Sequence, residues 1–381
     1  MLSGAFWRSP WVGLTARFYR WRDGLLADGR FHRVAAAFPP TRWIVRRRTR
    51  ELFDITAGFV YSQVLFACVR LDLFPRLAGG PRGLAELAAD FALPPQALQH
   101  LLRAARELRL LRRCADGRWA LGELGAASLG SPGIAAMVAH HDMLYRDLAD
   151  PLALLRDRGD AALAGYWAYA GGAAPADAQR TDPYSDLMAA SQSFIAEDVL
   201  AAYPMRGVQQ LLDVGGGSGV FVEQALRRHP GLRATVFDLP PVAARALERL
   251  QAAGLAERGA AIGGDMFRDA LPGGAQLISL VRILHDHDDE AVLSLLRAAR
   301  RALPADGRLL VAEPLAGTPG AGGVGAYFEL YLWAMGSGRP RRRQELRHML
   351  EATGFTEVRE YRTRRPLLVR VLAARPAPGA E

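Results

Sequence analysis

The sequence predicts an α/β protein, with a doubly wound, mostly parallel sheet in its C-terminal half and a mainly helical N-terminal domain. From residue 207 onward, apolar runs that suit buried strands alternate with amphipathic segments, which is typical of a parallel sheet with crossover helices. These segments cover 209–214, 220–229, 233–238, 241–252, 259–263, 275–282, 288–302 and 307–312. A helix over 343–353 and two strands over 356–363 and 367–374 then predict a terminal antiparallel hairpin.

The segment before this sheet has the plan of a winged helix. Helical spacing of apolar residues predicts helices over 51–70, 84–89 and 97–111, the last opened by a proline pair. Asp116-Gly117 predicts a hairpin turn between two short strands. Such a module can read DNA, but Glu107 interrupts the arginines of its last helix, so a scaffold or dimerisation module is favoured.

These patterns predict three parts. Residues 1–50 form a basic, aromatic-rich arm, 51–185 a winged-helix-like dimerisation domain, and 186–381 the domain with the parallel sheet. Residues 160–184, rich in Ala, Gly and Pro, predict a loop between domains with short helical pieces, and 194–203 predict a connecting helix.

Composition limits the class of protein. With 381 residues, half of them hydrophobic, the chain can bury a substantial core, and two domains are expected. No apolar run reaches the length of a membrane span, and the start lacks the long apolar core of a signal peptide. Cys68 and Cys114 are too few for a disulfide framework or a metal cluster, which suits a reducing cytoplasm.

The net charge of +9 lies in the arm, where residues 1–50 contain eleven arginines and two acids. Arginine interleaved with aromatic residues suits an interfacial segment on an anionic bilayer. An arm that packs across a dimer partner, with its arginines in solvent, is an equally simple interpretation, and nucleic acid is a third. The aromatic residues of the arm are Phe6, Trp7, Trp11, Phe18, Tyr19, Trp21, Phe31, Phe38 and Trp43.

The most informative motif is LLDVGGGSG at 211–219. An apolar run ends in Asp213, closely spaced glycines follow, and an amphipathic segment begins at Val220, which predicts a strand, a tight turn and a helix. Glycine lets the backbone turn sharply and lets a ligand approach closely. Asp238 ends the next apolar run, so it should lie at the tip of the neighbouring strand, where a carboxylate can accept both hydroxyls of a ribose.

Two cofactors fit a glycine turn followed by a ribose-binding acid: a dinucleotide and S-adenosylmethionine. The dinucleotide motif is G-x-G-x-x-G, whose last glycine permits close packing of helix on strand. That last place is Val220 counted from Gly215, or Val222 counted from Gly217. The chain instead has G-x-G-x-G preceded by an acid, and this spacing favours S-adenosylmethionine. A nicotinamide cofactor and a purely structural turn are the alternatives.

The carboxyl ends of the strands supply the other site candidates, because ligands of such sheets bind there. The third strand ends at Asp265, Met266 and Phe267, which suit an adenine: the acid for its exocyclic amine and the apolar pair for its ring. Core packing explains the two apolar residues equally well. The fourth strand ends at His285 and the fifth at Glu313.

His285 is the strongest candidate for a catalytic group, because a histidine at a buried strand end beside a cofactor can act as a general base near neutral pH. Glu313, one strand away, can accept from its second ring nitrogen and fix its tautomer. A purely structural histidine is the alternative, and the role of Asp286 stays open. Asp288 and Asp289 are expected to cap the next helix. No metal site is expected, because adjacent residues of a strand point to opposite faces.

Residues 51–375 resemble the winged-helix class of bacterial and plant O-methyltransferases, through the motifs LLDVGGGSG, VFDLP, GDMF, ILHDHDDE and GRLLVAEPL. The resemblance implies a Rossmann-like methyltransferase domain and an N-terminal domain that forms an intertwined homodimer and contributes to the substrate pocket. It also implies roles at the matching positions. Asp213, Gly215, Gly217 and Gly219 would line S-adenosylmethionine, Asp238 would hold its ribose, Asp265 with Met266 its adenine, His285 would be the base and Glu313 its orienting acid.

A narrower resemblance lies in RRRTRELFDITAGFVYSQVLFACVRLDLF near the start and in MGSGRPR at 335–341. Both are similar to the carotenoid O-methyltransferases of purple photosynthetic bacteria, the demethylspheroidene and hydroxyneurosporene group. Those enzymes methylate a tertiary hydroxyl at the end of an acyclic carotenoid. The apolar residues of 327–335 would then supply a tunnel for the polyene, with Tyr61 and residues near Met188 and Phe194 as further wall. Plain helix core is the alternative.

The chain departs from the wider family at three places. His287 stands where members commonly have tryptophan, Val281 where many have lysine, and Pro340 where phenol-methylating members usually carry a second glutamate. The third departure leaves Glu313 as the single orienting acid that we expect. A phenolic or polyketide hydroxyl is the alternative substrate on the same scaffold, and a regulator that senses S-adenosylmethionine is the non-enzymatic alternative.

Overall fold

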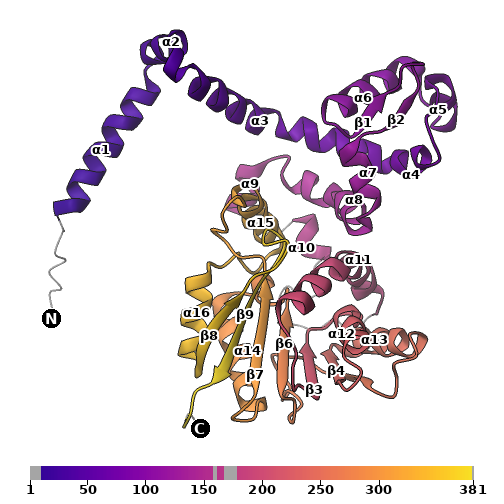
Figure 1. Ribbon diagram of the computed structural model, residues 1–381, viewed down its shortest axis with the longest axis vertical. Coiled ribbons are helices and arrows are strands. Elements are labelled where there is room, and N and C mark those ends of the chain that lie inside the picture. Colours follow the sequence, from indigo (N-terminus) through magenta and orange to yellow (C-terminus); the bar gives the residue numbers. More distant parts are fainter. Residues whose placement is uncertain (1–9, 158–160, 167–177, 380–381) are drawn as a thin grey trace. The chain divides into compact units, whose positions relative to one another are not determined.

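The computed structural model describes residues 10–157, 161–166 and 178–379. The chain divides into two compact units, coloured along the sequence in Figure 1. One contains Met1–Leu71 and Pro81–Ala120, and the other contains Asp72–Gly80 and Leu121–Glu381. The predicted fold class is confirmed, because a helical N-terminal region precedes a seven-stranded, mostly parallel sheet.

The first unit opens with three helices, of which the third is longer than predicted. They are α1 (Pro10–Ala27), α2 (Gly29–Ala37) and α3 (Pro39–Arg70). The predicted helix over 51–70 is the second part of α3, because its proline pair occupies the first turn, where proline is tolerated, and nothing in the following arginine-rich stretch breaks the helix. Residues 39–50 of the arm therefore belong to the same helix as the apolar stretch that follows.

One side of α3 is apolar and open to solvent in the single chain. Exposed side chains along it are Leu52, Phe53, Ile55, Phe59 and Val60. Among the described residues, α3 is the one helix long and apolar enough to cross a membrane by length and composition. The expectation that no apolar run reaches that length was therefore wrong.

The winged-helix plan predicted for this unit is present. It consists of α5 (Leu84–Asp90), α6 (Pro95–Glu107), β1 (Leu111–Arg113) and β2 (Trp119–Leu121). The α6 helix buries Leu98, Leu102 and Ala105. It ends four residues before the predicted end, and Arg109 then adopts a left-handed backbone with φ of 58°.

The second unit is built on one sheet with the strand order β5-β4-β3-β6-β7-β9-β8. The first five strands pair in parallel, and the last two pair antiparallel, as the terminal hairpin predicts. The order reverses between β3 and β6, which is the switch point where sheets of this kind bind ligands. The strands are β3 (Gln210–Val214), β4 (Arg233–Asp238), β5 (Gly259–Gly263), β6 (Leu277–Val281), β7 (Arg308–Glu313), β8 (Phe355–Tyr361) and β9 (Arg370–Pro376).

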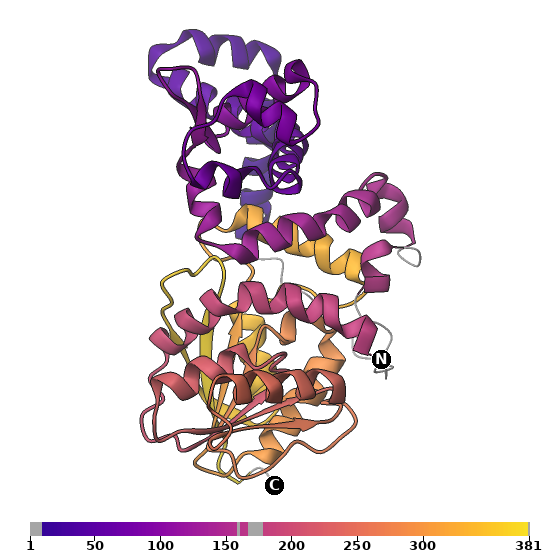
Figure 2. The ribbon, with the colours of Figure 1, turned by 90° about the vertical axis from the view of Figure 1, so that its right-hand side faces the viewer.

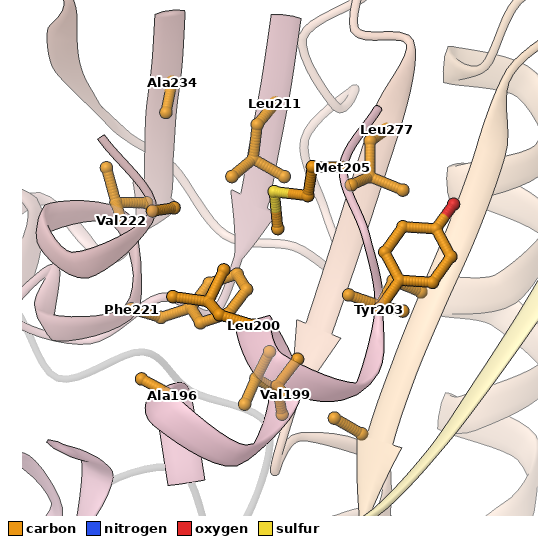
Figure 3. Close-up of a cluster of buried hydrophobic side chains, with 14 of the residues drawn as sticks. Ala196, Val199, Leu200, Tyr203, Met205, Leu211, Phe221, Val222, Ala234 and Leu277 are labelled. Atoms are coloured by element: carbon orange, nitrogen blue, oxygen red, sulfur yellow. The ribbon is translucent and has the colours of Figure 1, made fainter. Parts of the chain in front are cut away.

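Helices cover both faces of this sheet (Figure 1). On one face lie α11 (Ala178–Ala202), α12 (Val220–Arg228) and α13 (Pro240–Ala252), and on the other lie α14 (Asp289–Ala302) and α16 (Arg343–Ala352). Figure 3 shows the first face, where Phe221 of α12 and Leu200 of α11 pack near Leu211 of β3 and Met205 of the loop before it. Both clusters are made of side chains almost fully withdrawn from water, so the strand tips are held by rigid layers.

The remaining helices are mostly ones that the sequence did not predict. They are α4 (Leu73–Ala78), α7 (Glu123–Leu129), α8 (Pro132–Asp147), α9 (Pro151–Arg156), α10 (Ala162–Tyr166) and α15 (Gly322–Met335). The α8 and α15 helices pack side by side (Figure 2). The predicted loop over 160–184 is partly helical, since α10 and the start of α11 fall within it, and residues 167–177 lie outside the described residues. The connecting helix predicted over 194–203 is the second half of α11.

Candidate active site

The glycine turn follows β3 in the predicted way. Gly215, Gly217 and Gly219 have φ values of 68°, 57° and 78°, a left-handed conformation that favours glycine. At Gly215 the space is closed as well, since an added Cβ would lie 2.5 Å from Cδ1 of Ile283. The turn therefore requires glycine for its conformation and for its close contact with the segment after β6.

Asp238 lies at the tip of β4, next to this turn, as predicted. Its Oδ2 accepts a hydrogen bond from the backbone N–H of Gly217 at 2.8 Å, and its Oδ1 accepts one from Leu239 at 2.7 Å. Burial raises the pKa of Asp238 to about 6. Each oxygen can accept a further donor, so the carboxylate suits the two hydroxyls of a ribose.

Asp213 is buried at the end of β3, opposite Ser279 of β6. The Ser279 hydroxyl donates to its Oδ1 at 2.5 Å, whereas its Oδ2 has no hydrogen-bond partner among the described residues. Burial raises the pKa of Asp213 to about 7, although the Ser279 hydrogen bond acts against this rise. A buried carboxylate oxygen without a donor is costly, and a cationic or donor group of a ligand would satisfy it.

The end of β5 brings together the residues predicted to hold an adenine. Asp265 Oδ1 accepts from the backbone N–H of Phe267 at 2.9 Å, and Met266 packs against the core. Phe267 is partly exposed, and its ring meets that of His287 edge to face at 4.8 Å between centroids. Burial lowers the pKa of His287 to about 4, so its imidazole is neutral and adds a second ring beside that of Phe267.

His285 and Glu313 are in direct contact. Nδ1 of His285 lies 2.6 Å from Oε2 of Glu313, and the other carboxylate oxygen, Oε1, accepts from the backbone N–H groups of Ile283 and Leu284. His285 is 5% exposed and Glu313 2% exposed. Since Glu313 accepts at Nδ1, this nitrogen carries the hydrogen and Nε2 is the nitrogen that can exchange a proton.

A second carboxylate, that of Asp286, approaches the same imidazole. Its Oδ1 lies 3.1 Å from Nε2 of His285. Burial alone would lower the pKa of His285, but the charges of Asp286 and Glu313 outweigh this effect and raise the pKa above its usual value. The imidazole is therefore a stronger base than a free histidine, and its protonated form is stabilised at both nitrogens.

One local prediction around His285 was wrong. His285 lies on a 3₁₀ turn, Leu284–Asp286, rather than at the strand tip, because β6 ends at Val281 and Arg282 adopts a left-handed backbone with φ of 60°. The argument from alternating strand faces consequently does not apply there. Within the described residues, no group of three or more His, Cys, Asp or Glu side chains is arranged to hold a metal ion.

The acids expected to cap α14 lie at its N-terminus, as predicted, but their carboxylates bind groups outside the helix. Asp288 occupies the N-cap position without a side-chain cap, and its carboxylate accepts from the backbone N–H of Gly338 at 3.0 Å. Asp289 pairs with Arg339 and Arg341. Sequence reasoning missed these arginines and Ser279. A buried arginine gives no local signal, because its burial depends on a turn that lies more than fifty residues earlier.

An aromatic wall from α15 lies beside His285. The rings of Phe328 and His285 meet edge to face with their centroids 5.9 Å apart. Tyr327 stacks on Tyr331, with 5.4 Å between the ring centroids. Each tyrosine hydroxyl contacts a histidine of α8: Tyr331 with His140 at 3.0 Å, and Tyr327 with His141 at 2.9 Å. Of the other apolar residues expected to form a tunnel, Leu332 and Met335 are buried, whereas Leu330 and Trp333 are exposed at their outer edges.

This wall is uncharged at neutral pH. Burial lowers the pKa of His140 to about 4 and also lowers that of His141. Burial raises the pKa of the Tyr327 hydroxyl. The further wall residues expected from the sequence are not placed beside these rings. The Met188 side chain lies outside the described residues, and Tyr61 belongs to the first unit. Phe194 lies under the guanidinium of Arg365 at 4.9 Å.

Comparison with known proteins identifies the family. Residues 145–356 match the family model of the O-methyltransferase domain, and residues 53–131 match that of the O-methyltransferase dimerisation domain. The chain belongs to the O-methyltransferase family. The winged-helix unit is therefore the family's dimerisation domain, which supports a homodimer, and the exposed apolar side of α3 falls largely within it.

Curated relatives agree with this assignment. The chain is 45% identical to a demethylspheroidene O-methyltransferase of Cereibacter sphaeroides, over 93% of this chain and 94% of that one. It is 40% identical to the demethylspheroidene O-methyltransferase of Rhodobacter capsulatus, over 91% of this chain and 86% of that one. Both the wider and the narrower resemblance seen in the sequence are thereby confirmed.

Among solved structures, human N-acetylserotonin methyltransferase in complex with S-adenosylmethionine has a TM-score of 0.72 at 25% identity, with 87% of this chain and 98% of that chain covered. The enzyme described here is an S-adenosylmethionine-dependent O-methyltransferase. Its residues fit this cofactor, because the unsatisfied Oδ2 of Asp213, the left-handed glycine turn and the carboxylate of Asp238 meet at the switch point of the sheet.

Cofactor binding should weaken at low pH. In the roles expected for them, Asp238 and Asp213 would accept donors from the cofactor best when ionised, and their pKa values of about 6 and about 7 place protonation between pH 8 and 5. Below each pKa, the affinity should fall by up to about tenfold per pH unit. Calorimetric titration of S-adenosylmethionine across this range measures the effect.

The variant Asp238→Asn should bind S-adenosylmethionine more weakly at pH 8, and its affinity should depend less steeply on pH. The matched control is Asp306→Asn, at an exposed turn, which should bind as the wild type does. A wild-type pH dependence in Asp238→Asn would contradict the assignment of Asp238.

Proposed function

We propose that the enzyme methylates the tertiary 1-hydroxyl of an acyclic carotenoid of the demethylspheroidene or hydroxyneurosporene type, with His285 as general base. The identity to two demethylspheroidene O-methyltransferases, over more than nine tenths of this chain, supports the substrate class. The observation that carries the proposal within the structure is a base of raised pKa beside an uncharged aromatic wall.

The wall suits a polyene for two reasons. A polyene is long, apolar and polarisable, so it is stabilised by ring faces and edges and would be opposed by a buried charge. Phe328 and Tyr327 provide the rings, and the contact of Tyr327 with His141 satisfies its hydroxyl without ionisation. The hydroxyl end of the substrate would then lie near the imidazole of His285, past Phe328.

The base suits a tertiary alcohol. S-adenosylmethionine supplies an activated methyl group on a sulfonium centre. An aliphatic hydroxyl is far less acidic than a phenol, so Nε2 of His285 would take its proton as the carbon–oxygen bond forms and the methyl–sulfur bond breaks, rather than before. The neutral thioether of the spent cofactor would be the leaving group. The imidazolium that results donates to Glu313 from Nδ1 and to Asp286 from Nε2. Both carboxylates therefore stabilise the charge that develops on the base.

The same proposal assigns the other site residues as the sequence predicted. Asp213 and the glycine turn line the cofactor, Asp238 holds its ribose, and Asp265 with Met266 holds its adenine. The three-part organisation into an arm of residues 1–50, a dimerisation domain of 51–185 and a methyltransferase domain of 186–381 is part of the proposal.

We also propose that the arm contacts an anionic bilayer, from which such an apolar substrate would be taken. The family's dimerisation model begins at residue 53, after the arm. The described part of the arm exposes Phe18, Tyr19, Trp21 and Trp43 among its arginines. Aromatic rings favour the headgroup region of a bilayer, and each arginine near an anionic surface contributes about 1 kcal/mol.

Purified enzyme incubated with labelled S-adenosylmethionine and a panel of hydroxylated compounds tests the substrate class. We expect label in 1-hydroxy carotenoids. We expect little label in phenols or aromatic polyketides, because these shorter molecules would contact fewer rings of the aromatic wall. Transfer to a phenol in preference to every carotenoid would favour the alternative substrate, and no transfer with sequence-specific DNA binding would favour the regulator.

Replacing the base should separate chemistry from binding. His285→Ala should lose turnover by at least about a hundredfold, the usual contribution of a positioned acid–base group. Its affinity for S-adenosylmethionine, measured by calorimetry, should change by less than about threefold, because His285 does not form the glycine turn. His348→Ala, on the outer side of α16, is the control and should turn over normally. A near-normal rate in His285→Ala would remove this residue from the mechanism.

Vesicle sedimentation tests the arm. The enzyme should bind vesicles that contain phosphatidylglycerol more tightly than vesicles of phosphatidylcholine alone, and salt should weaken binding. The triple variant Arg17→Gln, Arg20→Gln, Arg30→Gln should lose this preference, and the control variant Arg301→Gln, Arg362→Gln, Arg364→Gln should keep it. If the arm variant instead dissociates the dimer and leaves vesicle binding unchanged, the arm packs on the partner.

A further inference from the structure

The residues that carry the base form a short turn with little support of its own. Residues 284–287, here called the base turn, follow β6 through the left-handed Arg282 and precede α14. A 3₁₀ turn of this length makes few and poorly aligned internal hydrogen bonds. The orientation of His285 therefore depends on what binds the backbone of the base turn from outside.

One segment binds every carbonyl of the base turn. Residues 337–341, here called the strap, connect α15 to α16. The four carbonyls of the base turn accept in sequence from four different donors of the strap. Leu284 accepts from Nη1 of Arg341, His285 from the backbone N–H of Arg339 at 2.9 Å, Asp286 from the hydroxyl of Ser337 at 2.6 Å, and His287 from Nη2 of Arg341 at 2.6 Å.

The strap also lies too close to the base turn for any side chain at its centre. A Cβ added to Gly338 would overlap the carbonyl oxygen of His285 and lie 2.5 Å from the carbonyl carbon of Asp286. The φ of Gly338 is 83°, in the left-handed region. Glycine at this position is required by the backbone conformation and by the close approach to the residue that carries the base.

Arg341 is the centre of this arrangement. Its side chain is 2% exposed, yet it carries a charge, which is costly to bury unless its donors are satisfied. The planar guanidinium spans two carbonyls of the base turn and the carboxylate of Asp289 together. Lysine has one nitrogen at the end of a flexible chain, so it cannot reproduce this fixed, divergent set of bonds.

We propose that the strap positions the imidazole of His285 between Glu313 and Asp286 by binding the carbonyls of the base turn, a proposal that rests on the proposed role of His285. In this chain proline occupies position 340, where the resemblance to phenol-methylating enzymes would put a second glutamate. The strap acts through the backbone that bears the base, and Ser337, Gly338, Arg339 and Arg341 are positioning residues that do not touch the reacting atoms.

The effect is measurable at the imidazole itself. The charged groups that face His285 are Glu313 from β7, Asp286 from the base turn and Arg282 from the end of β6, and His287 is neutral. The two carboxylates raise the pKa of His285 and Arg282 opposes them. If the base turn loosens, the ring moves away from the carboxylates, so its pKa should fall.

The test compares Arg341→Lys and Ser337→Ala with the control Arg343→Lys, which changes an exposed arginine paired with Glu360. Loss of one or two net hydrogen bonds should lower kcat by about fivefold to fiftyfold. The KM and the calorimetric affinity for S-adenosylmethionine should stay within about twofold, and the acid limb of the kcat–pH profile should move to lower pH. Gly338→Ala should be more severe, and Arg343→Lys should match the wild type in every measurement.

Nuclear magnetic resonance titration of the His285 ring in the same variants is independent of turnover. A lowered imidazole pKa in Arg341→Lys and Ser337→Ala supports positioning, and the resonance is assigned by its absence in His285→Ala. An unchanged imidazole pKa in folded Ser337→Ala and Arg341→Lys overturns the proposal. If Arg341→Lys does not fold, Ser337→Ala alone decides by the same criterion. If His285→Ala turns over normally, the base assignment fails, while the titration still reports whether the strap holds the ring.

Discussion

The carboxylate of Glu313 is the interaction on which the rest of the site depends. It is buried at the end of β7 and accepts three donors, the backbone N–H groups of Ile283 and Leu284 and the imidazole of His285. The first two bonds shape the chain as it leaves β6, and the third fixes the tautomer of the ring. One side chain on a rigid strand thus determines where the neighbouring segment turns and which nitrogen of the His285 ring is held by a carboxylate of the sheet.

The same edge of the sheet concentrates buried negative charge. Asp213, Asp238, Asp286 and Glu313 all lie near the carboxyl ends of the parallel strands, where burial raises the pKa of the first two. S-adenosylmethionine carries a positive sulfonium centre. A cation placed at this edge would offset the cost of ionising the carboxylates, and by linkage the ionised carboxylates would favour the cation.

Much of this architecture follows from the sequence, because strands and helices of the second unit are local in pattern. The strands over 209–214, 233–238 and 259–263 agree with the structure to within one residue, since each is an apolar run closed by an acid or glycine. The contact between His285 and Glu313 was also predictable, because adjacent parallel strands end at the same edge.

The parts that the sequence did not predict depend on contacts between distant segments. The turn that carries His285 departs from strand geometry because Arg282 takes a left-handed conformation, which no residue type there announces. The burial of Arg341 and the pairs of His140 and His141 with tyrosines of α15 join segments that are separated by 54 to 191 residues. Neither periodicity nor local propensity contains that information.

The apolar side of α3 has a practical consequence for how this enzyme is handled. Side chains such as Ile55, which is 79% exposed, and Phe59, which is 72% exposed, are costly to leave in water, and a second subunit that covered them would lower that cost. Unfolding is then coupled to dissociation, so the midpoint of a thermal melt rises with protein concentration. Variants of this enzyme are then to be ranked by stability from melts recorded at the same subunit concentration.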